Sequence, residues 1–215
     1  MRFRPFFSAV SISLLFAAAA NAAHVDMNDP RRALGREDNI RVDAELLQDF
    51  LSPSSSLSVT YQIENLTQQT IGVADKVTDV SYDPDSATVT FAIGAEVPTG
   101  AAMPHVVTIL PGQKRVLTAG GMLHVAVPRA RTPWSIVPRY VQIKVNVLRD
   151  ITPFEALLAQ QAKSAVAPAL PNDLFDKWVD ANDAVFLNSI PVHWAGRDAN
   201  DDGGDIADRG SARGH

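Results

Sequence analysis

Leu57-Ser-Val-Thr-Tyr-Gln-Ile-Glu64 alternates apolar and polar residues from end to end. Successive side chains of a β-strand point to opposite faces, so this stretch is typical of a strand with one buried and one solvated face. A shift of one residue would turn every apolar side chain to solvent, and the register is therefore strongly specified. We expect the buried face to consist of Leu57, Val59, Tyr61 and Ile63.

Similar alternation appears on both sides of this stretch. It covers residues 40–45, 88–93, 122–127 and 141–147. Turn-forming residues separate the apolar stretches, at Asp83-Pro84-Asp85-Ser86, Pro111-Gly112 and Gly120-Gly121. Many short strands with frequent turn signals favour an antiparallel sandwich over a parallel sheet. We therefore predict a mainly β fold, a single antiparallel immunoglobulin-like β-sandwich over residues 39–150.

The hydrophobic period changes after residue 150. A proline at the start and apolar residues at helical spacing predict a short helix from Thr152. A second amphipathic helix is expected from about Asn172 to Asn188, with an apolar stripe of Leu174, Phe175, Trp178, Val179, Val185 and Phe186. We interpret residues 151–195 as an extension of two C-terminal amphipathic helices. Their stripes either pack on the sandwich or form a surface for a partner.

The first residues carry an export signal. Residues 1–22 combine two arginines, an apolar run and the small-x-small sequence Ala20-Asn21-Ala22, which predict a cleavable signal peptide. The apolar run is shorter than the ~20 residues of a membrane-spanning helix. We expect a protein exported to the periplasm or outside the cell, with no membrane span after cleavage.

Two further segments lack any hydrophobic period. Residues 23–38 are polar and carry charges of both signs, so we interpret them as a flexible leader. Residues 196–215 are rich in aspartate, glycine and arginine, which predicts a disordered acidic tail. Neither segment is expected to contribute to the core.

The composition excludes several function classes. The chain has no cysteine, which rules out disulfides, thiolate nucleophiles and Cys-ligated metals. Its formal net charge is −5, and removal of the signal peptide with Arg2 and Arg4 takes it to −7. An acidic protein is a poor partner for nucleic acid or an anionic membrane surface. We expect no nucleic-acid partner.

No catalytic motif is present. The sequence lacks the nucleophile elbow G-x-S-x-G, the zinc motif H-E-x-x-H and a phosphate-binding glycine loop. We therefore predict that the protein is not an enzyme and has no cofactor. The leading hypothesis is an exported noncatalytic binding or accessory module that contacts another exported protein through loops, a sheet edge or its C-terminal helices.

Histidines and methionines suggest an alternative function. Each methionine after the first lies close to a histidine, and we single out Met103, His105, Met122 and His124 as metal-ligand candidates. Imidazole and thioether ligands suit Cu(I). If the segment around Met103 lies near the strand of Met122, the four side chains predict a copper site, and the protein would be a periplasmic copper-binding protein.

Two stretches resemble the N-terminal immunoglobulin-like domain of periplasmic pilus-assembly chaperones of the PapD type. They are Tyr61–Ile71, similar to that family's strand and turn, and Val107–Val116, similar to its Leu-x-Pro-Gly-Gln hairpin. The resemblance implies an immunoglobulin-like fold and partner binding by strand pairing. It would make Lys144 the family's basic anchor and Arg41 its arginine partner.

Overall fold

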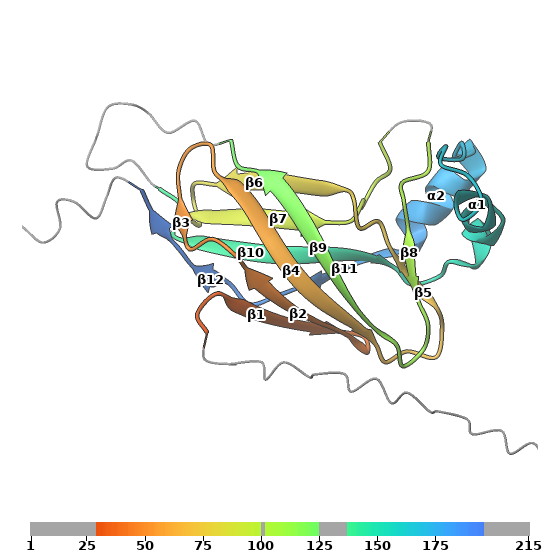
Figure 1. The fold of residues 1–215 in the computed structure, drawn as a ribbon, viewed down its shortest axis with the longest axis horizontal. Helices are drawn as coiled ribbons and strands as arrows, with labels where there is room; N and C mark the ends of the chain where they lie inside the picture. Colours follow the sequence, from red (N-terminus) through yellow and green to blue (C-terminus); the bar gives the residue numbers. More distant parts are fainter. Residues whose placement is uncertain (1–28, 100–101, 125–136, 196–215) are drawn as a thin grey trace, which may run out of the picture.

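The computed structural model describes residues 29–99, 102–124 and 137–195 (Figure 1). The chain forms several sheets, in which most strand pairs are antiparallel, and two helices follow in the C-terminal part. The prediction of a mainly β fold with two such helices is confirmed. The predicted signal peptide and the predicted acidic tail lie outside the described residues.

The first sheet of the described chain has the strand order β1-β2-β4-β9, and its neighbouring strands are all antiparallel. The strands are β1 (Arg32–Glu37), β2 (Ile40–Leu46), β4 (Ser56–Asn65) and β9 (Lys114–Met122). β4 contains the alternating stretch of residues 57–64 and lies inside this sheet, between β2 and β9. Its expected buried residues are all 1% exposed or less, which confirms the predicted register.

The second sheet of the described chain has the order β6-β7-β10-β5-β8, and β11 and β12 also pair with β10. The strands are β5 (Ile71–Val73), β6 (Thr78–Asp83), β7 (Thr88–Ile93), β8 (Val107–Ile109), β10 (Tyr140–Leu148), β11 (Asn182–Phe186) and β12 (Ile190–Pro191). A short parallel pair joins β3 (Phe50–Leu51) to β13 (His193–Trp194).

The second sheet departs from the purely antiparallel prediction, because β7 and β10 run parallel. Parallel neighbours need a crossover connection instead of a tight turn. Here the chain leaves β7, adds β8 to the second sheet and β9 to the first, and then runs in the direction of β7 again as β10 (Figure 1).

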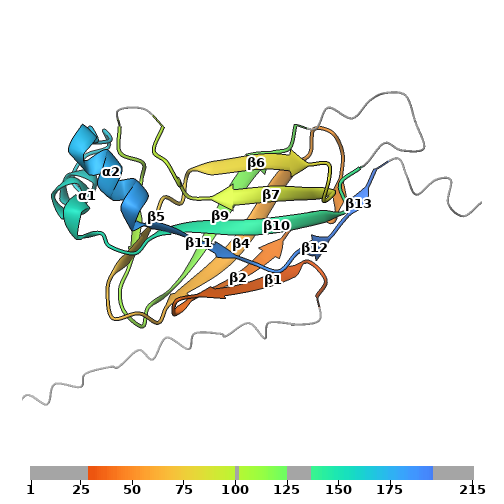
Figure 2. The ribbon, with the colours of Figure 1, turned by 180° about the vertical axis from the view of Figure 1, so that it is seen from behind.

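The main core lies between the two sheets. It is lined by alternate residues of β2, β4, β7 and β10, which are the residues that the alternation predicted to be buried. A second cluster lies under the helices α1 (Glu155–Gln161) and α2 (Asn172–Ala181), around Phe154 and Trp178. The rings of these two residues pack edge to face, 5.5 Å apart. The helices cover one end of the two sheets in both views (Figure 2).

The predicted leader is wrong for its last residues, since β1 lies within residues 23–38 and pairs with β2. The cause is the turn Asp38-Asn39, in which both residues have positive φ, 41° and 64°. Two central residues with positive φ are typical of the two-residue hairpin turn whose twist matches its strands. Asp38-Asn39 carries no glycine or proline to mark the turn, so the predicted fold begins one strand late.

The second helix ends earlier than predicted. It stops at Ala181, and residues 182–186 form β11 beside β10. Asn182 is extended, and its side-chain amide donates to the Ala95 carbonyl (2.8 Å). Val185, which we expected on the helical stripe, is buried in the main core instead. Pairing with β10 outweighs a helical pattern that contains a β-branched and an aromatic residue.

The expected turn at Gly120-Gly121 is also wrong, because β9 runs through both glycines and pairs with Leu57 and Ser58 of β4. A Cβ on Gly121 would lie 2.7 Å from a methyl group of Val80 and 2.9 Å from the ring of Phe91. Glycine is required here because the second sheet approaches the strand closely. Of the strand predicted for residues 122–127, residues 125–127 lie outside the described part.

Candidate functional site

β9 is the last strand of the first sheet, and in the described part of the chain no strand pairs with its second edge. Asn65 donates its N–H to the Gln113 carbonyl (3.1 Å) just before β9. Leu123 donates its N–H to the Ser55 carbonyl (2.8 Å) just after it. The odd-numbered residues of β9 therefore hydrogen-bond to β4. The even-numbered residues direct their N–H and C=O groups to the other side, and we call the stretch of Lys114, Val116 and Thr118 the open edge.

The side chains along the open edge are accessible. Val116 is 64% exposed, and Lys114, Arg115 and Thr118 are also exposed. Leu117 points the opposite way and packs partly buried against the main core. Lys114 forms an ion pair with Glu64 of β4 (3.1 Å). The open edge thus presents unpaired backbone groups beside one apolar side chain, with the Lys114–Glu64 ion pair at its start.

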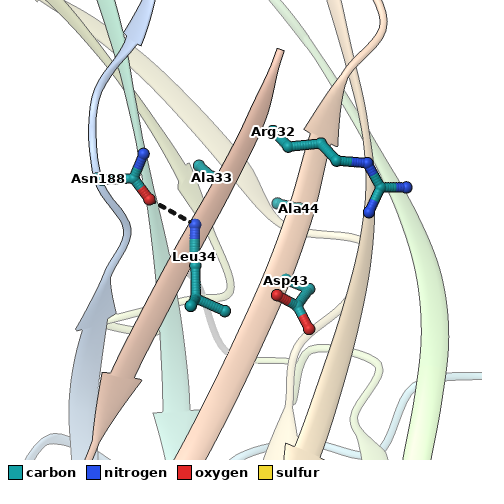
Figure 3. A pocket seen from close by; sticks show the side chains of 6 residues that line it. All are labelled: Arg32, Ala33, Leu34, Asp43, Ala44 and Asn188. Carbon is teal, nitrogen blue, oxygen red and sulfur yellow. Dashed lines mark hydrogen bonds between the residues drawn. The ribbon is translucent and has the colours of Figure 1, made fainter. Parts of the chain in front are cut away.

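The edge of β1 is closed at Leu34. Asn188 accepts the N–H of Leu34 with its side-chain oxygen (2.6 Å) and donates its own N–H to the Leu34 carbonyl (3.1 Å) (Figure 3). A Cβ on Gly35 would lie 2.5 Å from the Phe186 carbonyl oxygen, so the backbones of β1 and β11 are in contact here. A hollow of about 110 Å³ beside this contact is lined by Arg32, Ala33, Leu34, Asp43, Ala44 and Asn188.

Two further contacts close parts of other edges. Gln161 of α1 accepts the Val106 N–H (3.1 Å) and donates to the Pro104 carbonyl (3.0 Å) just before β8. The Thr78 hydroxyl donates to the Gly120 carbonyl (2.8 Å). This hydrogen bond occupies an outward carbonyl near the C-terminal end of β9. No such contact reaches the open edge from the described residues.

Asn65 fixes the loop that leads into β9. This residue is fully buried, and its side-chain nitrogen donates to the carbonyls of Gln69 (2.7 Å) and Ile109 (2.9 Å). Its side-chain oxygen accepts both the N–H and the hydroxyl of Thr67. Its backbone carbonyl accepts the N–H of Gly112, which has a φ of 71°. The start of the open edge is therefore held in one place by a single buried amide.

A buried carboxylate, that of Asp75, lies just after β5. Asp75 has a side chain only 6% exposed and accepts a hydrogen bond from Nδ1 of His105 (2.8 Å). Its second oxygen is 3.3 Å from Nζ of Lys76. Burial and then the charge of Asp75 raise the pKa of the Tyr61 phenol above its usual range. Carboxylate and imidazole form a pair, but none of the described residues adds a nucleophile to it by a hydrogen bond.

The four predicted copper ligands are not brought together. Met103 is 1% exposed and packs in the cluster under the helices, while His105 is bound to Asp75. Met122 and His124 are both exposed at the end of β9. Figure 1 places the segment before β8 next to the helices and the end of β9 beside β6. Copper binding stays a prediction for the pair Met122 and His124 alone.

The residues that the chaperone resemblance singles out lie on different sheets. Lys144 of β10 forms an ion pair with Glu96, and its ammonium lies 5.6 Å from the centre of the Phe186 ring. Arg41 of β2 pairs with Asp43 of the same strand (3.1 Å). The two cations therefore do not form a common site.

A sheet edge was among the predicted binding surfaces, but the residues of the open edge were not predicted. The misassigned Gly120-Gly121 turn concealed that residues 114–122 form one strand. The available signal was an apolar residue, Val116, at a position that alternation assigns to the solvated face. An exposed apolar residue on an edge strand is a sign of strand pairing.

Comparisons with known proteins give no match, whether with family models, with curated proteins or with solved structures. In the described residues, no helix is long and apolar enough to cross a membrane. The same residues contain no group of three or more His, Asp or Glu side chains placed to hold a metal ion.

Proposed function

We propose that this chain is an exported, noncatalytic immunoglobulin-like module that binds another exported protein. Its two facing sheets around one main core are consistent with such a sandwich. The predicted signal peptide at residues 1–22 supports export, and the acidic charge argues against nucleic acid as the partner.

The open edge of β9 carries the proposal. An extended peptide can add to an exposed sheet edge, where main-chain hydrogen bonds supply affinity and side-chain contacts supply specificity. Lys114, Val116 and Thr118 offer alternate N–H and C=O groups in the spacing that a partner strand needs. The edge of β1 offers none at Leu34, because Asn188 occupies both backbone groups of that residue.

The test is quantitative capture of a partner from the exported protein fraction of the source cells. Val116→Pro removes one outward N–H without touching the ladder to β4, since proline is tolerated on an open edge. Val116→Thr is the matched control, because it keeps the N–H and the strand preference. We expect a defined protein to bind the wild type and Val116→Thr but not Val116→Pro. Capture that is equal for all three chains, or no capture at all, contradicts the proposal.

A further inference from the structure

The open edge is short, and both of its ends are fixed. On its C-terminal side the Gly120 carbonyl already accepts the Thr78 hydroxyl (2.8 Å). On its N-terminal side the chain turns, since Gln113 donates its N–H to the Leu110 carbonyl (2.9 Å). A partner strand therefore has room for about five residues, opposite residues 114–118.

Arg115 places an uncompensated positive charge beside this edge. The charged side chains of β4 and β9 are those of Glu64, Lys114 and Arg115. Glu64 and Lys114 form an ion pair (3.1 Å). Arg115 is exposed, and its side chain has no hydrogen bond or ion pair among the described residues. It is therefore the cation of the two strands that a partner strand can neutralise.

Leu117 brings the main core to the surface two residues after Arg115. Its cross-strand neighbour Tyr61 is fully buried, but Leu117 itself is only partly buried against the main core. It belongs to the last strand of the first sheet, and none of the described strands pairs on its other side. Burial of apolar surface is favourable in proportion to its area. A partner residue opposite Leu117 therefore contributes most if it is apolar.

Val116 sets a third requirement, on the outer face of the first sheet. Its side chain points away from that of Leu117 and is 64% exposed. Cross-strand contacts between β-branched or aromatic side chains stabilise a strand pair. Three consecutive residues of a partner strand thus meet Leu117, Val116 and Arg115, each with a different preference.

From this arrangement, and resting on the strand pairing of the proposed function, we propose that the open edge preferentially binds an antiparallel peptide segment with the order apolar, β-branched, acidic. The β-branched residue exchanges backbone hydrogen bonds with Val116. Leu117 and Arg115 then face the apolar and the acidic residue in the narrow type of pair, in which side chains are closest. The whole chain has a net charge of −5, which favours one carboxylate at this position over a strongly acidic segment.

The test is an NMR titration of the protein with the capped peptide Ser-Thr-Val-Val-Glu-Thr-Ser and with the same peptide carrying lysine in place of glutamate. We expect the glutamate peptide to bind about fivefold more tightly and to shift the amide signals of Val116 and Thr118. Arg115→Glu should reverse this preference. Lys177→Glu is the matched control, because it makes the same charge change at an exposed position of α2 and should leave the preference as it is. A third peptide, with serine in place of the first valine, should bind more weakly because it leaves Leu117 uncovered.

The inference is overturned if no peptide binds the wild type, if the glutamate and lysine peptides bind it equally, or if Arg115→Glu still prefers glutamate. It is equally overturned if the serine peptide binds as tightly as the glutamate peptide. Val116→Pro should lose all peptide binding, because it removes an outward N–H of the open edge. Equal binding of the two charged peptides that Val116→Pro abolishes would contradict the sequence preference alone and leave strand pairing intact. The proposed function fails separately, when capture of the exported partner is absent or does not depend on Val116.

Discussion

At the scale of single residues, the buried polar groups are the most informative. Asn65 satisfies its whole side chain through Thr67, Gln69 and Ile109. The Tyr61 hydroxyl, in contrast, is buried without a hydrogen-bond partner among the described residues. An unsatisfied buried polar group lowers stability, whereas a satisfied one fixes a conformation. Loss of the polar atoms should therefore lower the stability of the protein at Asn65 and raise it at Tyr61.

Tyr61→Phe should stabilise the protein by about 1 kcal/mol, because it removes a buried hydroxyl that forms no hydrogen bond. Thermal melts at neutral pH measure the change. Tyr82→Phe is a suitable comparison, since its ring is only partly buried. A loss of stability in Tyr61→Phe would show that the hydroxyl has a partner after all.

Tyr61 should also make the fold sensitive to alkaline pH. Burial and the charge of Asp75 raise its pKa in the folded state, whereas the unfolded value is about 10. The folded state then holds the proton more tightly, so this stability is fully present below pH 10 and is lost as the pH rises above it. Burial also raises the pKa of Tyr82. Denaturant melts between pH 8 and about 11 measure the free energy of unfolding, which should fall less steeply with pH in Tyr61→Phe than in the wild type. Parallel curves of this free energy against pH would refute the prediction.

Asn65→Ala should cost about 2–4 kcal/mol, since it removes the donor to the buried Ile109 carbonyl, one of the two donors to the Gln69 carbonyl and the acceptor for Thr67. Asn65→Asp is the closest control in shape, but its carboxylate cannot donate to the carbonyls of Gln69 and Ile109, so it should be destabilising as well. Urea unfolding measures both. If both variants matched the wild type, the amide would not hold the loop before β9.

At the scale of elements, alternation predicted the strands well where one face is buried along its whole length. β4 and β10 are such strands, and their registers were correct. The prediction was wrong where tertiary contacts overrule local pattern: Gly121 has no side chain because Val80 and Phe91 occupy the space, and Val185 extends beside β10. Neither contact can be read from neighbouring residues. The same applies to the open edge, which depends on which strands the fold leaves unpaired.

The register of β4 can be tested with one pair of substitutions. Val59→Asp puts a carboxylate in the core and should unfold the protein or cost several kcal/mol, while Thr60→Asp on the solvated face should stay within about 0.5 kcal/mol. Thermal melts of the two variants give the comparison. Equal effects would mean that the side chains do not alternate as described.

At the scale of the whole molecule, the features group by face and by end. The helices cover one end of the two facing sheets (Figures 1 and 2). The open edge lies along the rim of the first sheet.

Export predicts the start of the mature chain. Cleavage after Ala22 leaves alanine at both positions that signal peptidase reads, so exported protein should begin at Ala23. Intact-mass measurement of material from the exported fraction decides this. A mass that retains residues 1–22 would mean that the apolar segment is an anchor.

Amide hydrogen exchange of β9, measured by NMR with and without the captured partner, tests strand pairing at the open edge most directly. In the free protein, Leu117 and Ala119 should be protected by β4, whereas Val116 and Thr118 should exchange quickly. On binding, Val116 and Thr118 should become protected while Leu117 and Ala119 stay as they are. A bound partner that leaves Val116 and Thr118 exchanging as fast as before would contradict the account.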